Sequence, residues 1–224
     1  MQRRLAARFR VIALDLRNHG ASPHDAVMDY PAMAADVRET LAALGALPAA
    51  LVGHSMGGKV AMRLALERPA EVRRLLVADI APVRYRSHFG AMIAALRALP
   101  RAPGTTRADA DAALADAVPE PSMRAFLLQN LRFGVAPAWR IGFEEIAAAL
   151  PAIEGWPDEA GATYGGPALF VAGERSDYVA PEAKPAIRAL FPQARFVTLK
   201  GAGHWLHADN PEGFGAIVEA FAAG

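Results

Sequence analysis

The chain contains five short apolar runs, each rich in Val, Ile, Leu or Ala and each closed by polar or glycine-containing residues. Continuous apolar runs of this length, bounded by turn residues, are typical of strands buried on both faces of a parallel sheet. We therefore predict five strands in one sheet. They lie within FRVIALDLRNHG (9–20), AALVGHS (49–55), VRRLLVADIAP (72–82), PALFVAGERSDYV (167–179) and ARFVTLKGAGHW (194–205).

Stretches with apolar residues at helical spacing alternate with these runs. One begins at Pro31 and ends before Gly45, a second follows Ser55 and is stopped by Pro69, and the last begins after Asn210. Proline in the first turn and glycine just past the end are typical of helix boundaries. Because strands alternate with helices, the pattern predicts an α/β fold with a mostly parallel sheet flanked by helices. The last helix carries an apolar stripe formed by Phe214, Ile217, Val218 and Phe221.

The pattern changes in residues 83–164, where helical segments follow one another and no strand is expected. These segments include FGAMIAALRAL, ADAALADAV, SMRAFLLQNLRF and IGFEEIAAAL. We predict that residues 83–164 form a helical cap inserted into a core made of residues 1–82 and 165–224. A length of 224 residues with 53% hydrophobic content suits one such domain with an insertion.

Charge and composition narrow the function classes. The formal net charge is +1 and the 24 Lys and Arg residues are scattered, so we expect no nucleic-acid partner and no binding to an anionic membrane surface. The chain has no cysteine, which excludes disulfides, thiolate catalysis and cysteine zinc sites. No apolar run has the length of a membrane span, and the first ten residues do not resemble a secretory signal. We expect a cytoplasmic protein with no bound metal, and the sequence leaves its oligomeric state open.

The stretch LVGHSMGGK (51–59) places Ser55 in the pattern G-x-S-x-G between a predicted strand and a predicted helix. A sharp turn there lifts the serine hydroxyl above the sheet as a candidate nucleophile, and we expect Gly53 and Gly57 to be needed because a Cβ would not fit. The first backbone N–H groups of the helix point beside the hydroxyl. We therefore predict that the Met56 N–H stabilises an oxyanion.

A serine hydroxyl needs a base, and His204 at the end of the last predicted strand is the candidate. An acid must then orient the imidazole. Asp79 and Asp177 each follow a predicted strand, and all strands of a parallel sheet end at the same edge. The residue pattern leaves both acids open. For His54 and His207 we expect packing or hydrogen-bonding roles.

Six segments together resemble the α/β-hydrolase superfamily and, within it, the small YbfF-type esterases: ALDLRNHGASP, DYPAMAADV, LVGHSMGGKVAM, VADIAPVRY, FVAGERSDYV and GAGHWLHADNP. The resemblance implies that Asp79 is the orienting acid, with Ser176 as a supporting residue. In the wider superfamily the position of Asp177 more often holds the acid. The resemblance further implies a serine hydrolase of carboxylic esters or acyl thioesters with small to medium acyl chains, working through an acyl-enzyme without a cofactor.

The start of the chain departs from this family. Members have two or three strands before the segment that matches VIALDL, and the loop after the last of them supplies a second oxyanion N–H. We therefore expect an N-terminally incomplete fold in which a central strand is missing. The alternative function is a catalytically impaired, hydrolase-like protein that binds a small molecule or partner without turnover, because loss of one oxyanion donor costs about a hundredfold to a thousandfold in rate.

Four further residues receive predictions. Trp139, Phe143 and Trp205 are candidates for contacting the substrate, although Trp139 and Phe143 could equally belong to the cap's own core. Lys59 lies one turn into the predicted helix after Ser55, and we expect it to be a solvated or ion-paired surface residue.

Overall fold

The computed structural model describes residues 1–86, 89–157 and 161–224. The chain divides into two compact units. We call them the sheet unit (Met1–Leu14, Asp29–Arg84 and Gly155–Gly224) and the helical unit (Asp15–Met28 and Tyr85–Glu154). The cap predicted at 83–164 overlaps the helical unit over 85–154, while the described residues after Glu154 lie with the sheet. Residues 87–88 and 158–160 of the predicted cap are outside the described residues.

The sheet unit is built on four parallel strands in the order β1-β2-β5-β6. Their bounds are β1 Ala49–His54, β2 Val72–Ala78, β5 Ala168–Gly173 and β6 Ala194–Leu199. All four lie within the predicted strand segments, and the parallel sheet is confirmed. Because every strand runs in the same direction, the residues that follow each strand gather at one edge of the sheet.

The first predicted strand, within residues 9–20, is wrong. Residues 10–16 are assigned to no strand, and most of their side chains are only partly buried. A parallel strand forms only when a neighbour accepts its hydrogen bonds. Within the described ranges, β1 pairs with β2 alone, so residues 10–16 make no ladder with its other edge. Val52 on β1 is accordingly 48% exposed.

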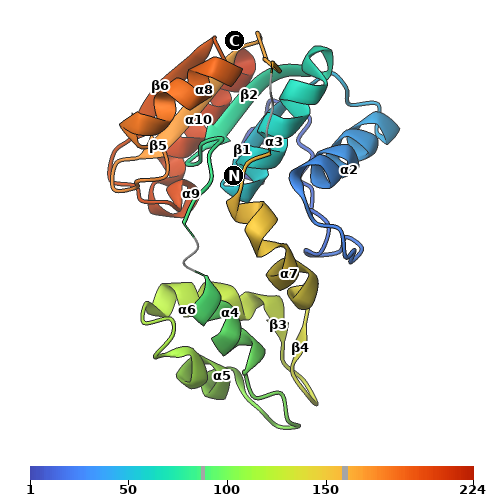
Figure 1. Ribbon diagram of the computed structural model, residues 1–224, viewed down its shortest axis with the longest axis vertical. Helices are drawn as coiled ribbons and strands as arrows, with labels where there is room; N and C mark the ends of the chain where they lie inside the picture. Colours follow the sequence, from blue (N-terminus) through green and yellow to red (C-terminus); the bar gives the residue numbers. More distant parts are fainter. Residues whose placement is uncertain (87–88, 158–160) are drawn as a thin grey trace. The chain divides into compact units, whose positions relative to one another are not determined.

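Helices cover both faces of the sheet (Figure 1). Side chains alternate along β2, so Val77 and its β5 neighbour Phe170 point to one face, where Gly58 approaches Val77 and Phe191 packs on Phe170. Leu76 and the residues beside it point to the opposite face, against the last helix. The helices of this unit are α1 Gln2–Leu5, α2 Tyr30–Ala43, α3 Met56–Glu67, α8 Lys184–Leu190, α9 Leu206–Asp209 and α10 Pro211–Ala223, with 3-10 turns η1 Pro69–Glu71 and η3 Pro181–Ala183.

The predicted helix boundaries of α2 and α10 are confirmed, and both helices begin with a side-chain cap. The Asp29 carboxylate accepts a hydrogen bond from the Ala32 N–H, and the Asn210 side chain accepts one from the Gly213 N–H. These bonds satisfy N–H groups that have no partner inside the helix. Gly45 follows α2 with a φ of 58°, a left-handed conformation that suits glycine at a helix end.

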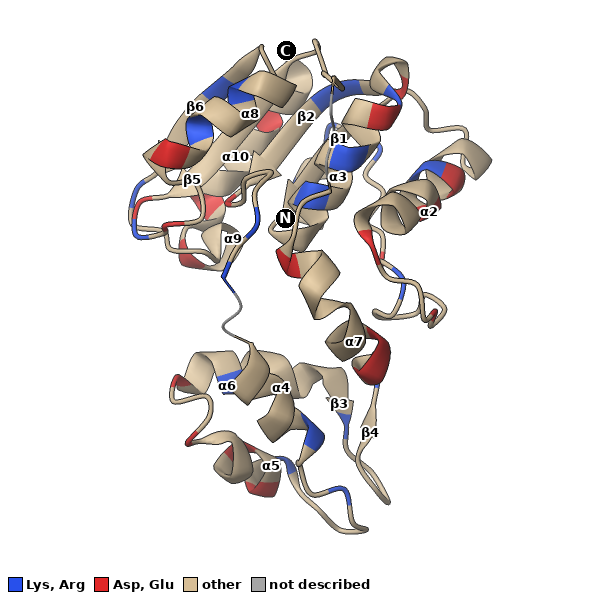
Figure 2. Cartoon of the chain, in the orientation of Figure 1, with Lys and Arg blue, Asp and Glu red and all other residues tan. Residues whose placement is uncertain are grey.

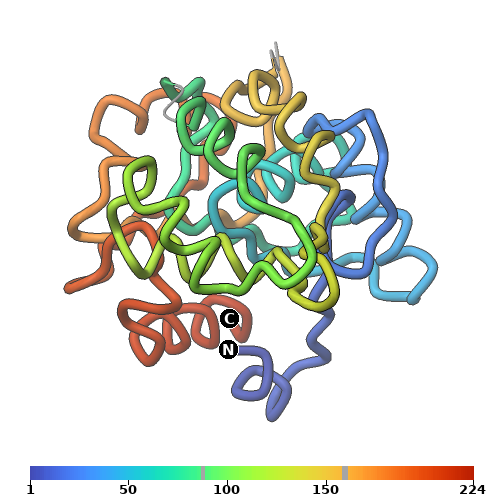
Figure 3. Tube along the Cα trace, turned by 90° about the horizontal axis from the view of Figure 1, so that it is seen from below, coloured from blue at the N-terminus to red at the C-terminus, as the bar shows by residue number. Residues whose placement is uncertain are grey.

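The first and last helices of the sheet unit pack together. Arg4 on α1 forms ion pairs of 2.7 Å with both Glu212 and Glu219 on α10. Figure 3 shows α1 beside α10, with the chain termini marked close to them. Leu5 adds an apolar contact to the cluster formed by α10 and the sheet. The N-terminal residues are therefore anchored through the C-terminal helix.

The helical unit has its own small core. Its helices are α4 Gly90–Arg97, α5 Arg107–Leu114, α6 Pro121–Leu127 and α7 Phe143–Glu154, with the 3-10 turn η2 Leu128–Asn130. The expectation that this region holds no strand is wrong, because β3 Leu131–Arg132 pairs antiparallel with β4 Ala138–Trp139. Strands of two residues are too short to produce a recognisable alternation in the sequence. The core consists of Leu96, Leu99, Ala110, Leu114, Leu128, Leu131 and Phe143.

Charged residues of both signs are spread over both units (Figure 2). Within the residues that the structure describes, we find no helix with the length and apolar content needed to cross a membrane.

Candidate active site

Ser55 lies at a sharp turn between β1 and α3. Its φ of 52° and ψ of −123° are rare for a residue other than glycine. The Ser55 N–H donates to the Ala78 carbonyl at 2.9 Å, and the Ser55 carbonyl accepts from the Gly58 N–H at 2.8 Å. These bonds hold the strained conformation in place, and the strain is of the kind that gathers at functional sites.

Gly53 and Gly57 were both predicted to be needed because a Cβ would not fit, but only one of them is crowded. A Cβ on Gly53 would lie 2.2 Å from the Gly57 carbonyl oxygen, so Gly53 is required. A Cβ on Gly57 would meet nothing within 4 Å, so the expectation of crowding there is wrong. The crowded position is Gly58, where a Cβ would lie 2.8 Å from Cγ2 of Ile80. Gly57 approaches β1 through its backbone carbonyl oxygen, and the space where its side chain would lie is open.

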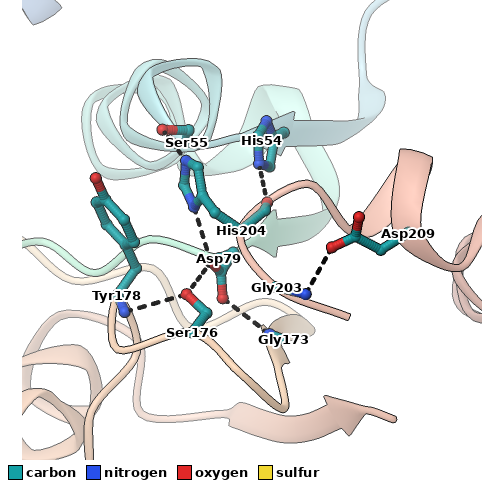
Figure 4. A network of polar contacts seen from close by, with 9 residues as sticks. All are labelled: His54, Ser55, Asp79, Gly173, Ser176, Tyr178, Gly203, His204 and Asp209. Carbon is teal, nitrogen blue, oxygen red and sulfur yellow. Dashed lines mark hydrogen bonds and ion pairs between the residues drawn. The ribbon is translucent and has the colours of Figure 1, made fainter. Parts of the chain in front are cut away.

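His204 joins Ser55 to Asp79 in one hydrogen-bonded chain (Figure 4). The imidazole Nδ1 lies 2.8 Å from Oδ2 of Asp79, and Nε2 lies 3.1 Å from Oγ of Ser55. A carboxylate accepts only, so Nδ1 carries the hydrogen. Nε2 is then the acceptor that faces the serine hydroxyl, which is the arrangement a general base requires.

Asp79 is held from several sides at the end of β2. Its φ is 54°, its side chain is fully buried, and its N–H donates to the Val171 carbonyl at 2.8 Å. Oδ1 accepts from the Gly173 N–H at 2.9 Å, and Oδ2 accepts from the Ser176 hydroxyl as well as from His204. Buried charges need such donors because burial removes their hydration. Ser176, predicted as a supporting residue, therefore contacts the carboxylate directly.

The second acid candidate lies elsewhere. Asp177 is next to Ser176 in the loop after β5, but Asp177 is exposed and it is Asp79 that contacts His204. Both acids follow strand ends at the same sheet edge, as the sequence predicted. The geometry separates them because the loop after β5 turns Ser176, and not its neighbour, toward the buried carboxylate.

His54 supports the loop that carries His204. Its Nε2 donates to the His204 backbone carbonyl at 2.7 Å, which agrees with the expected hydrogen-bonding role. Burial lowers the pKa of His54 to about 4, so this imidazole is neutral near pH 7. The His207 ring packs edge-on to it at 5.3 Å. No group of three or more potential metal ligands occurs among the residues that the structure describes.

One residue of this site carried no sequence prediction. The Tyr178 ring stacks on the His204 imidazole with centroids 4.1 Å apart and planes 26° apart. Tyr178 lies five residues after the end of β5, and no periodicity or motif in this loop singles it out. Of its neighbours, Asp177 was a candidate acid and Ser176 matched a supporting residue of the family.

The three predicted substrate contacts fall in both units. Trp139 and Phe143 stack in the helical unit at 4.5 Å and 11°, and Phe143 is only 5% exposed within that unit's core. This packing fits the alternative in which both belong to the core of the cap. Trp205 lies in the sheet unit, with its ring 5.7 Å from those of His54 and His204.

The expectation of a surface Lys59 is wrong. The residue is 1% exposed, and its ammonium donates to the Val83 carbonyl at 2.9 Å and to the Gly155 carbonyl at 2.5 Å. The Tyr30 ring lies 5.5 Å away. Backbone carbonyls and an aromatic face replace the water that a buried ammonium loses. Lys59 lies on the buried side of α3. The sequence MGGKVAMRLALE mixes polar and apolar residues, so it did not indicate which side of the helix is buried.

Comparisons with known proteins agree with this architecture. Residues 1–211 match the family model described as "alpha/beta hydrolase fold". The chain is 45% identical over 221 residues to "sn-1-specific diacylglycerol lipase ABHD11" of Mus musculus, which covers 96% of this chain and 72% of that protein. It is 38% identical over 214 residues to "Esterase YbfF" of Escherichia coli strain K12, which covers 95% of this chain and 82% of that protein.

A solved structure titled "Marine microorganism esterase" superposes with a TM-score of 0.87 and 35% sequence identity, covering 92% of this chain and 82% of that one. The family match spans most of the sequence, and the predicted resemblance to YbfF-type esterases is confirmed. The chain therefore belongs to the α/β-hydrolase fold family.

Proposed function

We propose that this carboxylic ester hydrolase cleaves esters or acyl thioesters of small to medium chain length through Ser55, His204 and Asp79, with a covalent acyl-enzyme. The observation that carries the proposal is the continuous chain from Oγ of Ser55 to Nε2 of His204 at 3.1 Å and from Nδ1 to Asp79 at 2.8 Å. A nucleophile, a base and an orienting acid in this order are the parts that acyl transfer needs.

In the first half-reaction the Ser55 hydroxyl attacks the acyl carbonyl while Nε2 of His204 takes its proton. The imidazolium that forms is stabilised by Asp79, whose Oδ2 already accepts the Nδ1 hydrogen. Collapse of the tetrahedral intermediate passes that proton to the leaving alcohol or thiol. The acyl group then remains on Oγ of Ser55.

In the second half-reaction water replaces the leaving group. Nε2 of His204 takes a proton from this water as it attacks the acyl-enzyme, and returns it to Oγ of Ser55 when the carboxylic acid departs. The same base therefore serves both steps, which is why its fixed tautomer matters.

The Met56 N–H is the proposed oxyanion donor of this chain. Met56 is the first residue of α3, where backbone N–H groups have no carbonyl one turn earlier in the helix. The positive end of the helix dipole also favours negative charge there. Because Ser55 and Met56 are consecutive residues, the proposal has the hydroxyl attack the carbonyl carbon while the N–H binds the oxygen of the same group.

Two observations support the proposed substrate class: the names of related proteins and the aromatic ring beside His204. Relatives named esterase and diacylglycerol lipase support acyl esters as the substrate class. Trp205, beside His204 and His54, is the proposed contact to the acyl group in the sheet unit. A substrate-contacting role for Trp139 and Phe143 stays a prediction.

A fluorophosphonate probe and a substrate panel test this function together. The panel contains p-nitrophenyl esters and acyl thioesters of increasing chain length, and a diacylglycerol because of the names of the relatives. We expect covalent labelling and turnover, both lost in Ser55→Ala. Asp177→Asn is the matched control and keeps both. Absence of labelling in the unsubstituted protein, with intact folding, would instead support a binding protein without turnover.

A further inference from the structure

The catalytic imidazole is enclosed by aromatic rings that meet it in different orientations. The Tyr178 ring is stacked on it at 4.1 Å, the His54 ring is tilted by 44° at 4.7 Å, and the Trp205 ring meets it edge-on at 5.7 Å. Figure 4 shows Tyr178 on one side of His204 and His54 on the other. Among these described rings, Tyr178 alone presents its face in parallel to the imidazole.

A parallel aromatic face distinguishes the two charge states of the base. The face of a phenol ring carries negative electrostatic potential, so it attracts a cation held within about 6 Å of its centre. His204 is neutral before the reaction and becomes an imidazolium as it takes the Ser55 proton. The stacking contact is therefore stronger in the transition state than in the resting enzyme, and only such differences accelerate a reaction.

The Tyr178 loop is fixed relative to the acid as well as to the base. Its N–H donates to the Ser176 hydroxyl at 3.4 Å, and that hydroxyl donates to Asp79. Burial, together with the charges of Asp177 and Asp79, raises the pKa of Tyr178 above its usual value of 10, so the ring is a neutral phenol near pH 7. A change in the acid limb of a pH–rate profile thus reports on His204 and not on Tyr178.

We propose that Tyr178 is a positioning residue for the base: its ring face holds the His204 imidazole in line with Ser55 and stabilises the imidazolium that forms during acyl transfer. This inference rests on the proposed function of His204. The other titratable groups that face or lie near the imidazole come from the ends of β1, β2 and β5 and from α9. They are His54, Asp79, Asp177, His207 and Asp209.

The pH dependence of kcat/KM distinguishes this role from simple packing. Replacing the ring by an aliphatic side chain in Tyr178→Leu removes the attraction to the cation, so the midpoint of the acid limb moves to lower pH by about half a unit. The plateau value of kcat/KM falls by about twofold to fivefold for the same reason. Tyr178→Phe keeps the aromatic face, so its midpoint stays within about 0.2 units of the unsubstituted protein.

A fluorinated series removes the ambiguity of a variant that packs poorly. Phenylalanine with one, two, three and five fluorine atoms at position 178 keeps the ring shape while its facial potential becomes progressively less negative. We expect the midpoint to move to lower pH with each step, and the His204 imidazole titration followed by NMR in the Ser55→Ala background to move in parallel. The NMR measurement needs no activity.

The outcomes separate the inference from the function on which it rests. A midpoint that is constant along the fluorinated series, or that moves equally in Tyr178→Phe and Tyr178→Leu, would overturn the role of the ring while leaving Ser55-dependent activity intact. Activity that survives in both Ser55→Ala and His204→Ala would instead overturn the proposed function. The NMR series would still report whether the ring stabilises the imidazolium.

Discussion

Ser55 and Asp79 share an unusual backbone conformation as well as a common contact to His204. Their φ values are 52° and 54°, a region that costs a residue with a side chain about 1 to 2 kcal/mol. Each follows directly on a strand, and each is held by a backbone bond to the neighbouring strand: Ser55 to Ala78 and Asp79 to Val171. The sheet therefore stabilises both turns that hold Ser55 and Asp79 at its edge.

The choice between the two acids is a prediction at this scale. Asp79→Asn preserves shape but presents an amide to Nδ1, which favours the wrong imidazole tautomer, and we expect kcat to fall by about 10³- to 10⁴-fold. Asp177→Asn changes an exposed carboxylate and should leave kcat within about threefold. Steady-state kinetics on a p-nitrophenyl ester compare them. Equal losses in both variants would contradict the assignment.

At the scale of elements, the packing of α3 on the sheet makes different demands at two adjacent glycines. A Cβ in Gly58→Ala would lie 2.8 Å from Ile80 and 3.1 Å from the Gly53 carbonyl, so we expect a loss of about 1 to 3 kcal/mol in the free energy of unfolding. In Gly57→Ala the new methyl group meets nothing within 4 Å. Alanine also favours a helix, so Gly57→Ala should be neutral or stabilising by up to about 1 kcal/mol.

Urea unfolding of both variants provides the measurement, and each variant serves as the other's control. A larger loss in Gly57→Ala than in Gly58→Ala would show that α3 approaches the sheet differently from the arrangement described above.

Lys59 links α3 to the segments from which the chain enters and leaves the helical unit. Lys59→Met keeps most of the side-chain volume but removes the donor to the Val83 and Gly155 carbonyls. An acceptor that loses its partner in a buried setting costs about 1 to 3 kcal/mol, so we expect destabilisation of that size or more. Lys200→Met alters an exposed lysine and serves as the control, with a change within about 0.5 kcal/mol. Equal urea midpoints for the two variants would contradict this prediction.

Strands with long apolar runs and helices with recognisable caps were predictable from the sequence. The pairing of strands and the burial of single side chains were not. The runs that became β1, β2, β5 and β6 are apolar over most of their length, and α10 begins at a recognisable cap. The run at 10–16 has the same composition but forms no strand, because pairing depends on a neighbour and not on local preference. Lys59 is buried for a similar reason: its acceptors come from residues 24 and 96 positions away.

In the candidate site too, residues marked by a local pattern were predictable, whereas contacts made through the fold were not. Ser55 and His204 were predictable because a motif and the order of strands mark them, and the sheet edge predicted that Asp79 and Asp177 would both be near. The sequence could not orient the loop after β5, which decides that Ser176, and not Asp177, points toward the Asp79 carboxylate. The stacking of Tyr178 depends on that same orientation, so no pattern in the chain indicated it.

At the scale of the whole molecule, the sheet unit places His54, a histidine with a strongly lowered pKa, beside His204, the proposed base. Burial lowers the pKa of His54 to about 4, whereas the same side chain in the unfolded chain titrates near 6.5. The unfolded state therefore binds more protons between these values, and stability must fall as pH drops through this window. His207, whose pKa is also lowered mainly by burial, acts in the same direction.

Acidification should accordingly weaken the sheet unit as pH falls from 7 toward 4. From the His54 values, we expect the free energy of unfolding to fall by about 2 kcal/mol between pH 7 and pH 5. Glu71 and Glu219 have pKa values lowered by hydrogen bonds from Arg38 and Arg4, so their contributions are lost only at lower pH. His54→Gln keeps an N–H donor but cannot titrate, and its stability should depend less on pH in this window. Urea unfolding at pH 5, 6 and 7, followed by tryptophan fluorescence, measures both proteins; parallel pH dependence would show that the buried His54 imidazole is not the group responsible.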